Sequence, residues 1–227
     1  MVADWLLKAA AEYNRASLET RDNYPAHVLM PIRTLAIIID WAFRSLPDEI
    51  LVGIDADEAR PNPREVDEKF GGAREGMFAG QGYLLGDPHF VNRGDSWSVH
   101  HLPEEWQDEV FGETRGARRS RFSSFLHVHP NAPSLPSEAD AESAQFTEGI
   151  ELILGLRYTP EGSLPWLEDV EGVRRMLTPE EEVGQLPVIG RAVTGHTIHS
   201  LELIAFHRTG FGVNVVMTDP EGKPIGW

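Results

Sequence analysis

The sequence predicts a single α/β domain in which helices accompany a mixed β-sheet. Two observations carry this prediction. An apolar segment with helical spacing follows the first short strand candidate, and a second helix signal comes directly after a buried strand in the middle of the chain. The chain has 227 residues, a length that suits one domain with extensions or at most two small domains.

The first part of the chain begins with an amphipathic helix. Because this helix precedes the other elements, we treat residues 1–25 as an N-terminal helical extension that packs on the domain or on a second subunit. Residues 26–227 then form the domain itself. The elements expected here are a helix at 2–18, a strand at 27–30, a helix at 32–46 that begins after Pro31, and a strand at 50–55.

Turn-forming residues divide the rest of the chain. Residues 56–74 are charged and rich in Pro and Gly, so they form an exposed insertion. Turn residues at 86–95 predict a hairpin between 77–85 and 96–102. The remaining expected elements are a helix at 104–111, a basic loop at 112–120, a strand at 121–129, a helix at 138–146, a strand at 150–156, a helix near 170–176, and a final hairpin of 200–207 and 212–217.

Composition limits the class of protein. Hydrophobic residues make up 41% and charged residues 25% of the chain, as in ordinary soluble globular proteins. No apolar run approaches a membrane span and the N-terminus lacks a signal-peptide pattern, so we expect a cytoplasmic protein without a membrane partner. The absence of cysteine excludes thiolate ligands and a cysteine nucleophile. The net charge of −16 argues against nucleic acid as a main partner and is compatible with a basic or mixed protein partner. A homo-oligomer and a subunit of a complex both stay open.

The segment HVHPNAPSLPSEAD carries the clearest chemical signal. It places His127 and His129 two residues apart, and Asp140 follows eleven residues after the second histidine. Alternate residues of a strand point to the same face, so both imidazoles can reach one ion. Ser137 opens a helix that carries Asp140 in its first turn. Two imidazole nitrogens and one carboxylate oxygen predict a zinc site whose fourth position is left for water, as in hydrolytic zinc enzymes.

Each part of this segment also has a simpler explanation. Two histidines at alternate strand positions are more often ordinary polar residues than ligands. Ser137 and Asp140 fit the S-x-x-acid signature of a helix N-terminus, where the hydroxyl caps the helix and the acid meets its dipole. The joint spacing favours the metal site, because these separate explanations do not account for it.

The spacing H-x-H, seven residues, S-x-x-D resembles the motif of the JAMM (JAB/MPN-type) zinc metalloprotease family, and Pro130 and Pro136 match it as well. The resemblance implies a curved, mostly antiparallel sheet that lies between helices. It also implies zinc held by the two histidines and the aspartate, with a water activated by an upstream glutamate. Ser137 would help to hold the substrate carbonyl or its oxyanion.

Two residues are candidates for that glutamate, which must accept a proton from the water and pass it to the leaving amine. Glu49 follows the second expected helix and opens an apolar strand. Glu75 lies 52 residues before His127, opens the expected hairpin and has a glycine seven residues later, as in many family members. Neither has the usual glycine three residues on, where Val52 and Phe78 stand. Glu75 is slightly favoured, and Glu49 stays open.

The resemblance therefore implies a zinc metallopeptidase or isopeptidase that cleaves an amide bond next to the C-terminal tail of a ubiquitin-like or other small protein. A catalytically silent MPN scaffold module, a RadC-like protein with the same motif spacing and a cell-wall peptidase of the same fold are the alternatives. His196 and His199 are weaker ligand candidates, because a strand would not align residues three apart.

Overall fold

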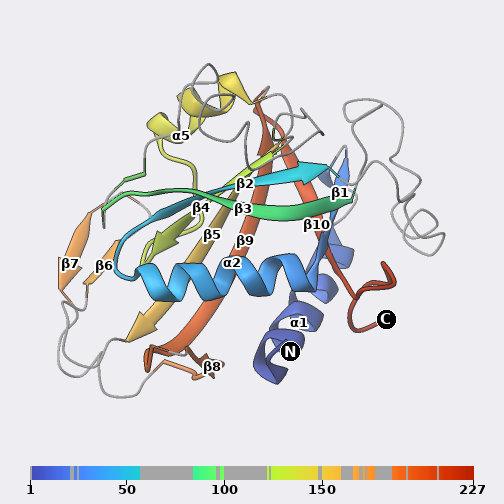
Figure 1. Ribbon diagram of the computed structural model, residues 1–227, viewed down its shortest axis with the longest axis horizontal. Coiled ribbons are helices and arrows are strands. Elements are labelled where there is room, and N and C mark those ends of the chain that lie inside the picture. Colours follow the sequence, from blue (N-terminus) through green and yellow to red (C-terminus); the bar gives the residue numbers. More distant parts are fainter. Residues whose placement is uncertain are drawn as a thin grey trace.

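A computed structural model describes the chain at residues 2–20, 23–24, 26–56, 84–95, 98–99, 122, 124–147, 150–159, 166–168, 171, 173–176, 186–192, 194–208 and 210–227. Its centre is a curled β-sheet crossed by a long helix (Figure 1). The expectation of a mixed α/β fold is therefore confirmed. Among the helices of the described residues, none is long and apolar enough to cross a membrane.

The sheet runs in the order β1-β10-β9-β5-β4-β2-β3, and β8 also pairs with β9. Two neighbouring pairs, β1 with β10 and β4 with β5, are parallel, and the other pairs are antiparallel. The strands are β1 (His27–Pro31), β2 (Ile50–Ala56), β3 (Leu85–Arg93), β4 (Ser124–Pro130), β5 (Ile150–Thr159), β8 (Gly190–Arg191), β9 (Thr197–His207) and β10 (Gly212–Thr218).

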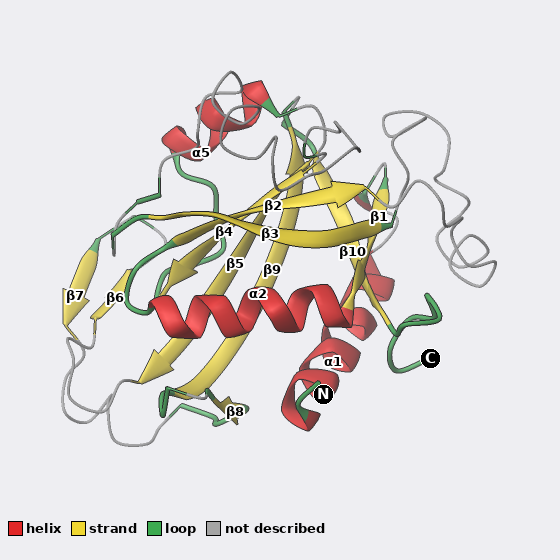
Figure 2. Ribbon diagram, in the orientation of Figure 1, coloured by secondary structure: helices red, strands yellow, loops and turns green. Residues whose placement is uncertain are grey.

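The main core lies between one face of this sheet and two helices, α1 (Asp4–Thr20) and α2 (Ile32–Ser45). Pro31 is the N-cap of α2, and the helix buries a stripe that includes Leu35, Ile38 and Ile39. In α1, Leu6 and Ala10 belong to the same core. A shorter helix, α5 (Glu138–Ser143), continues into the 3₁₀ turn η3 (Ala144–Phe146) and lies at the opposite end of the strands from α1 (Figure 2).

Two expectations about local structure are wrong. The turn-rich segment 86–95 is mostly strand β3, which pairs antiparallel with β2. Pro88 is accommodated there because β3 is the last strand in the sheet order, and edge strands tolerate proline. The helix expected near 170–176 is also absent from the described residues, since Arg174–Met176 form β7, which pairs with β6 (Trp166–Glu168).

Several other expectations fall outside the described residues. They are the insertion after residue 56, the start of the hairpin at 77–83, the helix at 104–111 and the loop at 112–120. Of the second hairpin strand expected at 96–102, the structure describes residues 98 and 99, which lie outside the assigned strands. The other expected helices and strands are confirmed, with ends that differ by a few residues. Gly210, at the turn between β9 and β10, has φ 88°, a conformation that glycine adopts without strain.

Candidate metal centre

Strand β4 directs both histidines to the side of the sheet that faces away from α1 and α2. Its alternate residues Leu126 and Val128 belong to the main core, so His127 and His129 project from the opposite face. His127 pairs with Leu51 on β2. Both imidazoles are largely buried, and their Nε2 atoms lie 3.0 Å apart.

Helix α5 brings Asp140 back to this histidine pair. Ser137 is the N-cap of the helix, and its hydroxyl accepts a hydrogen bond from the Asp140 N–H at 3.2 Å. The N–H and the hydroxyl of Ser137 in turn donate to Asp140 Oδ2, at 2.6 and 2.7 Å. This reciprocal pattern is a capping box. The capping role of Ser137 is therefore compatible with a ligand role for Asp140, because the bonds from Ser137 also direct the Asp140 carboxylate toward the histidines.

The geometry of the three side chains fits a metal ion. Asp140 Oδ1 lies 3.1 Å from His127 Nε2, and Asp140 Oδ2 lies 3.7 Å from His129 Nε2. Tetrahedral zinc with bonds of about 2.0–2.1 Å places its ligand atoms roughly 3.3 Å apart. The observed separations fall on both sides of that value, and one ligand atom from each residue lies within 4.8 Å of the others. His127, His129 and Asp140 could thus hold a metal ion.

A main-chain carbonyl fixes the orientation of the second histidine. The Nδ1 atom of His129 lies 2.8 Å from the carbonyl oxygen of Pro133. Since a carbonyl oxygen only accepts, Nδ1 carries a proton in this contact, which leaves Nε2 as the nitrogen available to a metal ion. Histidine ligands of metals are commonly oriented by a hydrogen bond of this kind.

The loop that supplies this carbonyl is held against β5 and β9. Asn131 has φ 55°, and its Oδ1 accepts a hydrogen bond from the N–H of Tyr158 on β5 at 2.8 Å. The hydroxyl of Ser134 donates to Glu202 on β9 at 3.1 Å. Beneath the loop lies Gly155, where a Cβ atom would approach Ser134 to 3.2 Å. Because glycine has no side chain at position 155, the loop can lie close to the sheet.

Two carboxyl groups at the site have shifted pKa values. Burial raises the pKa of Asp140, but the hydrogen bond and charge of His127, together with the bonds from Ser137, outweigh it and hold that pKa well below its usual range. Glu151 on β5 is 1% exposed. Burial raises its pKa to about 8, a hydrogen bond with Thr147 opposes the shift, and the charge of Asp140 adds to it. Sequence reasoning missed Glu151, although an acid inside the apolar run IELIL was a usable signal.

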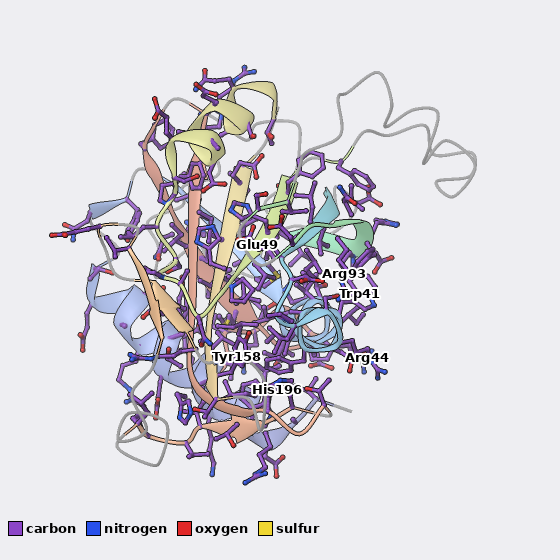
Figure 3. All side chains as sticks on the ribbon, turned by 90° about the vertical axis from the view of Figure 1, so that its left-hand side faces the viewer. Trp41, Arg44, Glu49, Arg93, Tyr158 and His196 are labelled. Atoms are coloured by element: carbon purple, nitrogen blue, oxygen red, sulfur yellow. The ribbon has the colours of Figure 1, made fainter. Side chains whose placement is uncertain are left out.

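The strand register places Glu49 on the face that carries the histidines. Leu51 of β2 pairs antiparallel with His127. Glu49 directly precedes β2 and lies two residues before Leu51, and His129 lies two residues after His127 on β4. If the register is continued by two residues, Glu49 and His129 share that face. Glu49 is 5% exposed, and Figure 3 shows it among the strands in the middle of the molecule. The other candidate, Glu75, lies outside the described residues.

The remaining histidine candidates lie apart from this group. His199 is held by Thr159 and by the carbonyl of Pro187, and the ring of His196 contacts Tyr158 at a centroid distance of 5.3 Å. Figure 3 shows Tyr158 and His196 at a different level of the molecule from Glu49. The metal-ligand group found in the described residues contains neither of these histidines.

Fold and site together define an α/β protein with a curled sheet and a candidate metal centre of two histidines and one aspartate. Comparison of the sequence with protein-family models finds no match, and comparison with curated proteins finds none either.

Proposed function

We propose that this protein is a zinc-dependent metallopeptidase of the JAMM type. The observation that carries the proposal is the convergence of His127, His129 and Asp140, with Glu49 on the same face of the sheet. Two imidazole nitrogens and a carboxylate oxygen that lie within 4.8 Å of one another form a ligand set that suits zinc. The carbonyl that orients His129 adds a partner that metal-binding histidines commonly have.

Zinc held by the three ligands would act as a Lewis acid and lower the pKa of a water molecule at the open position. Glu49 accepts the proton of the attacking water and delivers it to the leaving amine, which is the work of a general acid–base residue. Ser137 holds Asp140 in the orientation of a ligand. Its hydroxyl also supports the substrate oxyanion once it turns from Asp140 toward the substrate.

Glu49 is the better candidate for the base. The register of β2 and β4 supports it directly, and its main chain is fixed by two hydrogen bonds to the end of β3. Support for Glu75 rests on the sequence pattern alone.

The proposed substrate is an amide or isopeptide bond that follows the C-terminal tail of a ubiquitin-like or other small protein. Such a tail is extended and can bind by adding a strand to the edge of a sheet. Strand β3 is the last in the sheet order on the side of the candidate site. The family resemblance of the His127–Asp140 segment supports this substrate class.

The proposal is tested by metal analysis and by a cleavage assay on a panel of ubiquitin-like fusion proteins. The purified protein is expected to contain about one zinc per chain. His129→Ala and Asp140→Ala should lose it, whereas His196→Gln, which alters a histidine outside the group, should retain it. Full zinc content in His129→Ala or Asp140→Ala would contradict the ligand assignment.

Cleavage of the fusions should stop when a chelator is added and return with zinc. Glu49→Gln should keep its zinc and lose turnover. Turnover that survives in Glu49→Gln would remove Glu49 as the base. Zinc binding without cleavage of any fusion would favour a catalytically silent scaffold.

A further inference from the structure

The segment at the end of β3 is bound to the residue that we assign as the base. The Glu49 N–H donates to the Asp95 carbonyl at 2.8 Å, and the Gly94 N–H donates to the Glu49 carbonyl at 2.9 Å. These two bonds continue the ladder in which Ile50 pairs with Arg93. The N–H and the carbonyl of Glu49 are therefore both bound by one short segment, residues 93–95.

A side-chain contact holds the same two segments together from outside. The guanidinium of Arg93 binds Asp48 Oδ2 at 2.8 and 2.6 Å and donates to the carbonyl of Ser45 at 3.2 Å. Asp48 directly precedes Glu49, and Ser45 is the last residue of α2. Arg93 thus fixes the connection between α2 and β2 at both of its ends. Figure 3 shows Arg93 beside α2, on the outer side of Glu49.

The chain at Gly94 has no room for a side chain. A Cβ atom there would lie 1.8 Å from the carbonyl oxygen of Ser98. That carbonyl accepts the N–H of Asp95, and the Ser98 N–H donates to the Asp95 side chain. Glycine at position 94 avoids this clash. The Asp95 carbonyl can therefore accept the hydrogen bond from the Glu49 N–H.

From these contacts we infer that Arg93 and Gly94 are positioning residues for Glu49, which they hold on the sheet face that also carries His129. The inference rests on the proposed role of Glu49 as the base. An exposed ion pair of this kind adds little to stability, and Arg93 is 51% exposed. Its removal therefore leaves the fold intact and acts on the placement of the carboxylate.

The test uses the full-length protein loaded with Co²⁺, whose visible absorption spectrum and its change with pH report the surroundings of the ion. The variants are Glu49→Gln, Arg93→Gln, Arg93→Lys and Gly94→Ala. The matched control is Arg44→Gln. Arg44 forms a comparable exposed pair with Asp40 at 2.8 Å on α2, but it does not touch the Glu49 segment.

We expect every variant to bind about one Co²⁺ per chain. The pH midpoint of the spectral change should move in Glu49→Gln, and it should move in the same direction in Arg93→Gln and Gly94→Ala. Arg93→Lys should lie between Arg93→Gln and the wild type, and Arg44→Gln should equal the wild type. On a cleaved fusion, kcat in Arg93→Gln should fall on the order of tenfold to a hundredfold with KM little changed.

Failure of this inference can be told apart from failure of the proposed function. If Glu49→Gln moves the midpoint but Arg93→Gln and Gly94→Ala do not, the positioning role is overturned and Glu49 remains the base. A midpoint that stays at the wild-type value in Glu49→Gln overturns both assignments together. If the pH midpoint moves in Arg44→Gln as far as in Arg93→Gln, the positioning role is also overturned, since the loss of any surface charge would then produce the shift.

Discussion

At the scale of single residues, Ser137 connects helix formation to the candidate metal centre. Its hydroxyl caps α5 and also donates to the Asp140 carboxylate. The substitution Ser137→Ala removes both bonds, so it should lower the free energy of unfolding by about 1 kcal/mol. The freed carboxylate should also weaken zinc binding about tenfold or more. Unfolding in urea and competition with a chromophoric chelator measure the two effects, and Ser137→Thr, which keeps the hydroxyl, is the control. Unchanged zinc affinity in Ser137→Ala would contradict the role.

Glu151 gives a residue-scale prediction about pH. Its pKa is raised from 4.5 to about 8 in the folded protein, chiefly by burial. The folded chain therefore keeps a proton that the unfolded chain releases. The resulting stability is complete below the unfolded pKa of 4.5 and is lost as the pH rises through about 8. Urea unfolding of the chelator-treated protein should thus show stability falling by a few kcal/mol across this window. Glu151→Gln should largely remove the slope, and an equal slope in the variant would refute the assignment.

At the scale of elements, the loop between β4 and α5 depends on Gly155. A methyl group there would press on Ser134 at 3.2 Å and on the Ala132 carbonyl at 3.3 Å. Gly155→Ala should therefore displace the loop that carries the Pro133 carbonyl and lower zinc affinity by about tenfold to a hundredfold. Gly212→Ala is the matched control, because its Cβ would meet the exposed ring of Tyr24 at 3.0 Å, away from the site. Equal zinc affinity in the two variants would contradict the effect of the loop.

The elements that could be predicted from the sequence are those with a strong period or a long apolar run. The stripe of α2 and the apolar runs of β2 and β5 are of this kind. Strand β3 could not be predicted, because Gly86, Asp87 and Pro88 usually form turns. Its position at the end of the sheet order overrides that preference, and sheet order is set by contacts between distant segments.

The candidate site also has a part that could be predicted from the sequence and a part that could not. The grouping of His127, His129 and Asp140 could be predicted from spacing, because a strand and a helix start have fixed geometry. The position of Glu49 on the face of the histidines could not, since it depends on the register of β2 against β4. The roles of the Pro133 carbonyl and of Gly155 also left no signal, because a main-chain atom and a missing side chain have no sequence pattern.

At the scale of the whole molecule, α1 ties the two ends of the chain to the sheet. Asn14 of α1 is 1% exposed. Its Nδ2 donates to the carbonyls of Met217 and Ile225 at 2.8 and 2.9 Å, and its Oδ1 accepts the Met217 N–H at 2.8 Å. One side chain thus joins the N-terminal helix to β10 and to the C-terminal residues. The helix contributes to the main core through Leu6 and Ala10, so its removal would expose that core.

This connection predicts a separation between stability and metal binding. Asn14→Ala leaves the main-chain groups of Met217 buried without these partners, which should cost about 2–4 kcal/mol in the free energy of unfolding. Zinc content should stay at that of the wild type, because α1 packs on the face of the sheet opposite the histidines. Arg15→Ala, at an exposed neighbouring position of the same helix, is the control and should change stability little. Urea unfolding and metal analysis of both variants measure the effects. If Asn14→Ala were as stable as Arg15→Ala, α1 would be an accessory helix, and if it lost its zinc, the two faces of the sheet would be coupled.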